Sequence, residues 1–387
     1  MIYDDQNKLI PKKQNRVKKI LTQIANTIKN IAVSIGRGIK SVLTGIGIRI
    51  KGMNKWVKAV IIILLIIIVL AVTLVGKFVG DRLSKIHFKD LDEENLGINS
   101  ELYSEVEGLT QKEYDQVVNI LLLGSDSKDM SDQYAGNSDA IMIISINPKY
   151  KSIKLISIPR DTAANIDGFE NRYKINAAFA TGKEQLAVKT INENFGLNLK
   201  EYLTVNISSM YDIINEIGGI ELEITKEEMN SINHFVDMFY EFSGKPTKKV
   251  TSYGKVTLTG EQAAAHVKER EAGYRSGTTD YGDFGRTRRQ REVLVAMLNK
   301  ILTKDLGEIS RIIDLILAQV TTNMNVGKYM GMLPELVANK DAYLNNLTSV
   351  MIPKNEYSEE ILENGTFLYV TDMEKAKKDF IHYMYEM

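Results

Sequence analysis

The sequence contains no cysteine among its 387 residues. This absence excludes disulfides and thiolate metal sites, and it suits an exposed protein made without oxidative folding machinery. The rest of the composition is ordinary, because 49 basic and 49 acidic residues balance. A chain of this length can bury a sizeable core and still carry additional segments.

Acidic residues are missing from a long N-terminal stretch. Thirteen Lys or Arg residues and no Asp or Glu occur between Lys8 and Lys58. Apolar residues recur there at steps of three and four, as on one stripe of a helix, whereas five glycines oppose a single rigid helix. We interpret residues 1–56 as a basic tail, either a helix on the anionic membrane surface or a loosely ordered solvated segment.

Charge is absent altogether from Ala59–Gly76, eighteen residues dominated by Ile, Leu and Val. This run is long enough to span a bilayer, and residues 57–79 are predicted to form a transmembrane signal-anchor helix. Basic residues are denser before the run than after it. The positive-inside rule therefore places the N-terminus in the cytoplasm and everything after about residue 80 outside the cell. An extracytoplasmic location also makes nucleic acid an improbable partner.

Residues 80–115 are polar and are interpreted as a stalk or accessory segment. Three short apolar runs follow, at Val117–Ser127, Asp139–Pro148 and Ser152–Thr162. Runs of this kind, ended by Gly, Asp or Pro, are typical of strands buried on both faces of a sheet. Helical and strand patterns then alternate to the end of the chain. The sequence predicts an α/β/α sandwich around a central mixed sheet over residues 116–387, preceded by one transmembrane helix.

Polar residues at the ends of the predicted strands are candidates for chemistry. Asp126 follows the first strand and Asp139 opens the second. If these strands are neighbours, the two carboxylates can lie together at one edge of the sheet. Such a pair suits a hard divalent cation, Mg²⁺ or alternatively Mn²⁺, completed by water or phosphate oxygens. Each aspartate taken alone is better explained as a turn or helix-cap residue.

Basic residues near predicted element ends are the counterpart of these carboxylates. Arginine offers a planar fork to phosphate oxygens and lysine offers a point charge, so a metal-bound pyrophosphate would use both groups. Ordinary surface ion pairing is the alternative for each residue. The candidates are Arg160, Lys174, Lys268, Arg270 and Arg286.

Helical phase divides the arginine cluster in YGDFGRTRRQREV, residues 281–293. Arg286 and Gln290 lie four positions apart and share a helix face. Arg288 and Arg291 are out of phase with them and are predicted to be solvated. Arg289, one position from that face, is left open.

Five blocks resemble, in order, those of the LytR-CpsA-Psr family. They are NILLLGSDS, SDAIMIISINP, KLISIPRDT, YKINAAFATGK and GDFGRTRRQREV, and the similarity runs from about residue 119 to 302. The resemblance implies a membrane-anchored extracytoplasmic transferase of Gram-positive-type envelopes. Such an enzyme moves a glycopolymer, for example a teichoic acid or capsular polysaccharide, from polyprenyl pyrophosphate to a peptidoglycan sugar hydroxyl. The expected partners are that lipid-linked glycopolymer, the peptidoglycan acceptor and membrane lipid.

The resemblance also implies roles for individual residues. Asp126 and Asp139 would bind Mg²⁺, Asp161 and Asp283 would order loops, and the polyprenyl tail would occupy an apolar tunnel beneath the sheet. Asp126, Asp139, Arg160 and Arg286 would be catalytic. Contacts to the pyrophosphate are expected from Arg160, Lys174, Lys268, Arg270, Arg286 and Gln290.

Two positions depart from the family pattern. Asn137 replaces a common arginine, and Lys268 replaces the first arginine of an Arg-x-Arg pair, which keeps the charge but loses the bidentate geometry. The general base stays unassigned: Asp126, Asp139 and Asp161 qualify by position, whereas His234 and His266 qualify only by residue type. Two other functions remain open, a metal-dependent pyrophosphohydrolase and a non-catalytic lipid-phosphate receptor that senses the envelope.

Overall fold

The computed structural model describes residues 87–125, 136–243, 247–268 and 282–386. The predicted basic tail and the predicted transmembrane helix lie outside these ranges. Within them, no helix combines the length and the apolar character that a membrane crossing requires. The chain divides into two compact units, Met1–Phe88 and Lys89–Met387. Of the first unit, only the short strand β1 (His87–Phe88) is described.

A central mixed sheet organises the second unit, as the sequence predicts. Strand β2 (Val118–Ser125) runs parallel to β7 (Glu201–Asn206) and antiparallel to β3 (Ser138–Asn147). Strand β4 (Ser152–Ser157) follows antiparallel to β3, and β11 (Leu347–Met351) runs parallel to β4. On the other side, β10 (Val320–Thr322) pairs antiparallel with β7. The order in this unit is therefore β10-β7-β2-β3-β4-β11.

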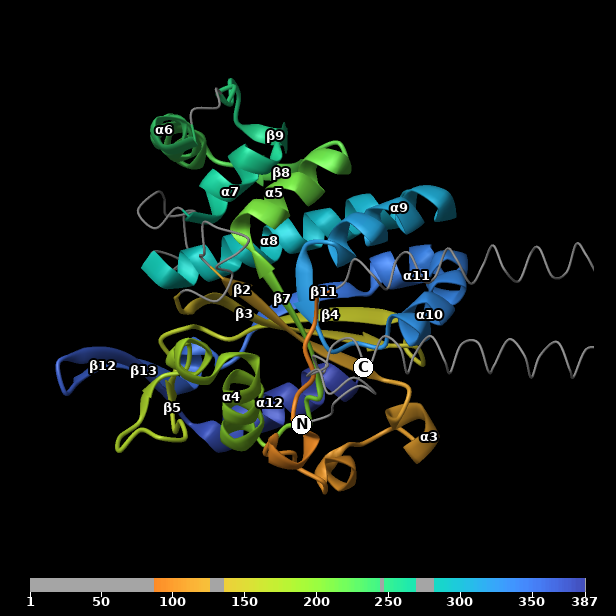
Figure 1. Cartoon of the computed structure of the whole chain (residues 1–387), viewed down its shortest axis with the longest axis vertical. Coiled ribbons are helices and arrows are strands. Elements are labelled where there is room, and N and C mark those ends of the chain that lie inside the picture. Colours follow the sequence, from red (N-terminus) through yellow and green to blue (C-terminus); the bar gives the residue numbers. More distant parts are fainter. Residues whose placement is uncertain (1–86, 126–135, 244–246, 269–281, 387) are drawn as a thin grey trace, which may run out of the picture. The chain divides into compact units, whose positions relative to one another are not determined.

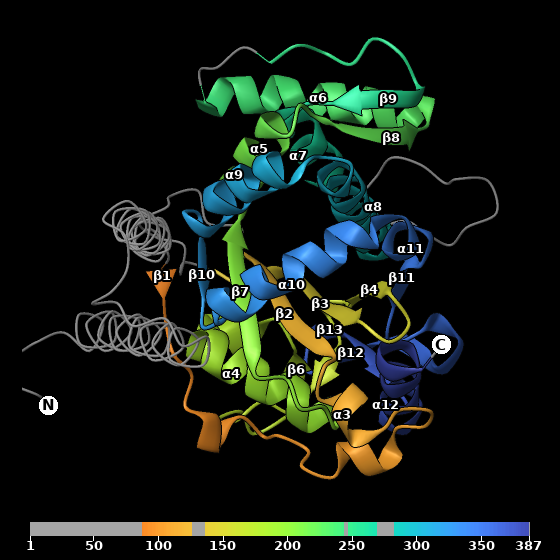
Figure 2. The same ribbon diagram turned by 90° about the vertical axis from the view of Figure 1, so that its right-hand side faces the viewer.

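Helices cover both faces of this sheet (Figure 1). One face carries α4 (Ala177–Phe195) and α12 (Met373–Tyr385). The other face carries α5 (Ile207–Glu216), α7 (Gly260–Lys268), α8 (Gly282–Leu302) and α9 (Leu306–Leu317). Beyond α5 and α7 lie α6 (Lys226–Ser243) and the two-stranded antiparallel sheet of β8 (Ile220–Ile224) and β9 (Gly254–Leu258), as Figure 2 shows. Helices α10 (Val326–Ala338) and α11 (Lys340–Asn345) connect β10 to β11.

Alternation along the strands explains why both faces are apolar. Side chains of a strand point to opposite faces in turn. Leu121 and Leu123 enter the core beneath α4 and α12 and are fully buried. Leu122, between them, points to the opposite face and lines a cavity there. The continuous apolar runs in the sequence thus serve a packed core on one side and a cavity on the other.

The helix α4 ends at Phe195, because Gly196 adopts the left-handed conformation that caps a helix C-terminus. A capping box begins α7. Thr259 N–H donates to Gln262 Oε1 at 2.9 Å, and Gln262 N–H donates back to Thr259 Oγ1 at 3.4 Å. Lys183 has φ of 57°, which kinks α4 after its first turns.

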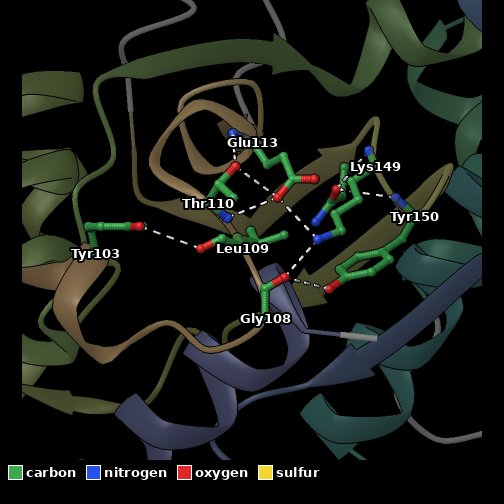
Figure 3. A network of polar contacts seen from close by, with 8 residues as sticks. Tyr103, Gly108, Leu109, Thr110, Glu113, Lys149 and Tyr150 are labelled. Carbon is green, nitrogen blue, oxygen red and sulfur yellow. Dashed lines mark hydrogen bonds and ion pairs between the residues drawn. The ribbon is translucent and has the colours of Figure 1, made fainter.

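Residues 89–115, interpreted from sequence as a stalk or accessory segment, pack into the core of the second unit. Leu96 and Leu102 are buried against α4. The segment forms the short turns η2 (Glu93–Asn95) and η3 (Leu102–Glu105) and the helix α3 (Gln111–Tyr114). Figure 3 shows how α3 is attached to the turn after β3: Lys149 Nζ donates to Glu113 Oε2 at 3.1 Å and to the Gly108 carbonyl at 2.7 Å.

Two small hairpins lie beside the sheet. One joins β5 (Ala163–Ala164) to β6 (Tyr173–Lys174), and the other joins β12 (Ser358–Glu363) to β13 (Thr366–Thr371). The turn η5 (Asn355–Tyr357) precedes β12. Tyr369 N–H donates to the Asp161 carbonyl at 2.8 Å, which attaches β13 to the segment between β4 and β5. This attachment matters because that segment carries predicted site residues.

Candidate functional site

Strand pairing brings the predicted carboxylate and arginine positions to one edge of the sheet. Ser125, the last residue of β2, pairs with Ser138, and β4 ends beside β3 through the pair Met142 and Ser157. Asp139 is therefore next to the end of β2, and Arg160 follows the end of β4. Asp126 comes directly after Ser125 in the sequence but lies outside the described residues.

A close backbone approach positions Asp139. A Cβ added to Gly124 would meet the Ala140 Cβ at 2.8 Å, closer than such atoms come in proteins. The register of β2 against β3 also shifts between Gly124 and Ser125. Glycine at position 124 thus permits the two strands to meet beside Asp139.

Asp139 lies between two guanidinium groups. Arg160 Nη1 donates to Asp139 Oδ1 at 2.7 Å, and Arg286 Nη1 lies 3.5 Å from Asp139 Oδ2. Gln290 Nε2 donates to the Asp139 backbone carbonyl at 3.3 Å, so α8 is attached to the first residues of β3. The sequence prediction that Arg286 and Gln290 share one helix face is confirmed, because both reach Asp139 and line the same cavity.

Asp283 connects the same two arginines from the first turn of α8. Its Oδ1 lies 2.7 Å from Arg286 Nη2 and 3.2 Å from Arg160 Nε. A carboxylate in the first turn of a helix also interacts favourably with the helix dipole. Arg286 is 4% exposed. Its guanidinium is therefore held in a fixed position at the start of α8.

Lys174 completes the cluster from strand β6. Its Nζ lies 2.6 Å from Asp161 Oδ1, and Asp161 Oδ2 lies 3.8 Å from Arg160 Nε. Three cations and three carboxylates thus meet at this edge. Burial lowers the pKa of Arg160, but the neighbouring carboxylates, Asp283 foremost, outweigh burial and raise that pKa above its ordinary value. Arg160 is consequently charged at any physiological pH.

An apolar cavity of about 1020 Å³ begins at this cluster. Its floor is the sheet face formed by alternate residues of β2, β3 and β7, and its walls come from α5, α6, α7 and α8. Asp139, Arg286 and Gln290 belong to its lining, which also includes Lys268. The predicted apolar tunnel beside the sheet therefore has a counterpart between the sheet and α8.

The remaining predicted site residues are placed as follows. Lys268 ends α7 and lines the cavity, whereas Arg270 lies outside the described residues. His234 lines the cavity from α6, and His266 is buried on α7, 1% exposed. Glu227, Asn230 and Ser231 of α6 also line the cavity. They are not predicted from the sequence, because nothing in the sequence pairs α6 with the sheet.

The prediction that Arg288 and Arg291 are solvated is wrong. Arg288 Nη1 lies 2.6 Å from Glu292 Oε1, and its Nη2 lies 3.3 Å from Oε1 of the buried Glu228. Arg291 donates to the Ser157 hydroxyl on β4. Arg289, left open from sequence, is 1% exposed. α8 is covered on several sides because α6, α7 and the sheet surround it, so helix phase alone did not identify a solvent face.

The carboxylates present fit Mg²⁺ in kind. Mg²⁺ is bound through one or two carboxylates together with water and substrate phosphates. Asp139 Oδ2 is the oxygen available for this, because its arginine neighbour at 3.5 Å is beyond ordinary hydrogen-bond length. Within the described ranges, no group of three or more His, Asp or Glu side chains is arranged to hold a metal ion.

Comparison with known sequences identifies similar proteins. A sequence model described as the LytR_cpsA_psr family matches residues 87–381. The polyisoprenyl-teichoic acid–peptidoglycan teichoic acid transferase TagU of Oceanobacillus iheyensis is 28% identical over 333 residues, which are 84% of this chain and 91% of that protein. The TagU of Bacillus mycoides is 30% identical over 263 residues, 68% of this chain and 76% of that protein.

Solved structures share the fold. A structure described as TagT bound to LI-WTA has a TM-score of 0.56 at 22% identity and covers 77% of this chain and 99% of its own. A LytR-CPS2A-psr family protein, YwtF (TagT), with bound octaprenyl pyrophosphate lipid has a TM-score of 0.50 at 22% identity and covers 72% and 94%. The mixed central sheet with flanking helices is thus common to these proteins.

Proposed function

This chain belongs to the LytR-CpsA-Psr family, and from that premise we propose that it is a glycopolymer phosphotransferase. It transfers an anionic glycopolymer, a teichoic acid or a capsular polysaccharide, from polyprenyl pyrophosphate to a sugar hydroxyl of peptidoglycan. The enzyme is anchored by the predicted helix at 57–79, with its catalytic unit outside the cell.

The observation that carries the proposal is a charged cluster that opens onto an apolar cavity. Arg286 and Lys268 face the same space as the aliphatic residues of β2, β3 and α8. A ligand suited to both parts has an anionic head and a long apolar tail. Burial of the tail in the cavity is favourable, because it removes apolar surface from water, and the phosphate head accepts charge-assisted hydrogen bonds from the guanidinium groups. Polyprenyl pyrophosphate has this construction. The TagT structure with octaprenyl pyrophosphate supports the assignment by analogy.

The arginines stabilise the charge that develops in the reaction. The acceptor hydroxyl oxygen forms a new bond to the phosphorus that carries the glycopolymer, while the bond from that phosphorus to the bridging oxygen breaks. The products are a phosphodiester and polyprenyl phosphate, and the hydroxyl proton passes to a base. Arg160 and Arg286 offer two forks to the non-bridging oxygens, and Gln290 keeps α8 beside Asp139.

Asp139, together with Asp126, would hold a magnesium ion. Such an ion would supply Lewis-acid polarisation of the phosphoryl oxygens. The proton acceptor remains one of the aspartates named from sequence. Of the two that are described, Asp139 is engaged by two arginines, whereas Asp161 faces Lys174 at the root of the β5–β6 hairpin.

The proposal is tested with the full chain in lipid nanodiscs. The protein is incubated with Mg²⁺, a polyprenyl-pyrophosphate-linked oligosaccharide and peptidoglycan oligomers, and the products are examined by mass spectrometry. A joined product whose mass equals acceptor plus glycan phosphate supports the transferase.

The other two functions predict different products. Free glycan phosphate without joined product indicates a pyrophosphohydrolase, in which water replaces the sugar hydroxyl. No turnover, with tight lipid binding retained in Asp139→Ala, indicates a receptor. Either outcome would overturn the transferase assignment.

A further inference from the structure

A second cleft lies beside the β5–β6 hairpin and carries exposed aromatic residues. Its volume is about 590 Å³, and it is lined by the loop 165–172, the last turn of α4 and the end of β13. Phe169 lines the cleft and is 36% exposed, and Tyr173 is 39% exposed. Their rings are stacked, with centroids 5.7 Å apart. Two stacked aromatic rings exposed to water indicate a binding surface, because a ligand that covers such rings buries a large apolar area.

The loop that forms this cleft is held in one conformation. Phe169 N–H donates to the Ile166 carbonyl at 3.0 Å across a tight turn, and Gly168 takes the positive φ of 88° that the turn requires. Asn165 N–H donates to Asn194 Oδ1 at 2.9 Å, and Asn194 Nδ2 donates back to the Asn165 carbonyl at 2.8 Å. A ligand would therefore meet a preformed surface and lose little affinity to loop ordering.

A bidentate ion pair fixes the other end of the loop. Arg172 Nε lies 3.1 and 3.2 Å from the two carboxylate oxygens of Glu363, and its Nη2 lies 2.5 Å from one of them. This pair connects the β5–β6 loop to the β12–β13 hairpin. It also occupies the guanidinium of Arg172.

Few residues of the chain separate the cleft from the charged cluster. Lys174 pairs with Ala163 in the hairpin and contacts Asp161 in the cluster. Tyr173 precedes Lys174 directly, and Phe169 is five residues before it, so the Cα atoms of Phe169 and Lys174 are at most about 18 Å apart. A ligand seated on the aromatic pair can extend to the reacting phosphate over a few sugar rings.

The polar lining selects against an anionic ligand. Besides Arg172, the charged side chains that line the cleft are the carboxylates of Asp167, Glu170 and Glu193. Asp167 and Glu193 both pair with Lys189, which leaves Glu170 facing the cleft together with the amide of Asn171. Like charges across a binding surface cost affinity, so a polyanionic glycopolymer is disfavoured here. An uncharged, hydroxyl-rich and N-acetylated glycan is favoured.

We propose that this cleft binds the peptidoglycan glycan strand that accepts the polymer, with Phe169 stacking on a sugar ring and Tyr173 packed against the Phe169 ring. The C–H face of a pyranose ring is apolar and slightly positive, which complements the negative face of an aromatic ring. Hydroxyl and acetamido groups at the ring edges meet Asn171 and Glu170. The assignment of an acceptor rests on the proposed transferase function, whereas the glycan-binding surface itself does not.

The test compares Phe169→Ala with the matched control Phe367→Ala in the full chain in nanodiscs. Phe367 is also an exposed phenylalanine, 65% exposed on β13, but it does not line the cleft. Calorimetric titration uses a tetrasaccharide of alternating N-acetylglucosamine and N-acetylmuramic acid whose lactyl carboxyl groups are capped as amides, so that the probe is uncharged, without donor. Phe169→Ala is expected to weaken the tetrasaccharide affinity by roughly two- to twelvefold. Phe169→Trp should retain the affinity, and Phe367→Ala should match the wild type.

Steady-state kinetics then separate this inference from the proposed function. Phe169→Ala should raise KM for the acceptor by the same factor and leave KM for the lipid-linked donor unchanged. Equal tetrasaccharide affinity in wild type, Phe169→Ala and Phe367→Ala would overturn the cleft while leaving the transferase intact. A third outcome is that Phe169→Ala loses tetrasaccharide binding while the wild type itself forms no joined product. This result would support the glycan-binding surface and overturn the transferase function.

Discussion

Replacing Arg286 with lysine isolates the contribution of its planar guanidinium. Arg286 contacts Asp283 at 2.7 Å and Asp139 at 3.5 Å, each through a separate nitrogen. A lysine ammonium is a single point and cannot serve both carboxylates and a phosphate in the same geometry. Turnover is therefore expected to fall by a factor of roughly 10² to 10³, about 2.7–4 kcal/mol of transition-state stabilisation.

Arg288→Lys is the matched control on the same helix. Arg288 also bridges two carboxylates, Glu292 at 2.6 Å and Glu228 at 3.3 Å, but it does not line the cavity. Arg and Lys have similar helix propensities, so both changes should cost similar stability, about 1–3 kcal/mol for a charge-assisted hydrogen bond. Only Arg286→Lys should lose turnover.

The assay measures joined product at saturating donor and acceptor, alongside thermal unfolding of both variants. Because kcat is compared at matched folding stability, a general loss of structure is separated from a loss of chemistry. Near-normal kcat in Arg286→Lys, or an equal loss of kcat in Arg288→Lys, would refute the proposal that the α8 face with Arg286 and Gln290 binds the reacting pyrophosphate.

Three further predictions concern the cavity, the metal and pH. Leu203→Trp should fill part of the cavity at a stability cost of about 1–3 kcal/mol, and it should weaken polyprenyl pyrophosphate binding at least tenfold while inorganic pyrophosphate binding is unchanged; equal lipid affinity by calorimetry would contradict it. Removing divalent cations with a chelator should weaken donor binding and abolish transfer, and added Mg²⁺ should restore both; full activity after chelation would exclude a metal role. Hydrogen bonding from the Thr110 backbone and then from Lys149 lowers the pKa of Glu113 from 4.5 to about 2. Its stabilising effect should be complete above pH 4.5 and lost as the pH falls towards 2, and Lys149→Met should raise this pKa in an NMR titration.

The strands and the main site positions are readable from sequence because one physical feature marks each. A continuous apolar run marks a strand covered on both faces, and the polar residue that ends it marks the sheet edge. β2, β3 and β4 are predicted in this way, and Asp139 lies at the sheet edge, where it meets Arg160. The expected neighbour of Asp139, Asp126, lies outside the described residues. The mixed order of the sheet also agrees.

The surroundings of α8 were not readable, for a reason that lies in tertiary structure. The partner of Arg288 is Glu228, sixty residues earlier on α6. Helical periodicity states which residues share a face but not what covers that face. Leu96 and Leu102 were missed for a related reason: they occur in short turns without a regular period, so their burial against α4 leaves no pattern in the sequence.

The charge balance of the cluster explains why donor and metal should bind together. Among the described residues, the cations of the cluster are paired with its carboxylates, so a pyrophosphate that enters alone must compete with Asp139 and Asp283 for Arg160 and Arg286. If Mg²⁺ binds the carboxylates, the guanidinium groups become available to the phosphate oxygens. Each carboxylate–guanidinium ion pair is then replaced by a carboxylate–metal contact and a guanidinium–phosphate contact. Each ligand must then raise the affinity of the other by the same factor, because coupling between two binding equilibria is reciprocal. A donor affinity that is equal with and without Mg²⁺ would mean that the carboxylates position the arginines and do not hold a metal.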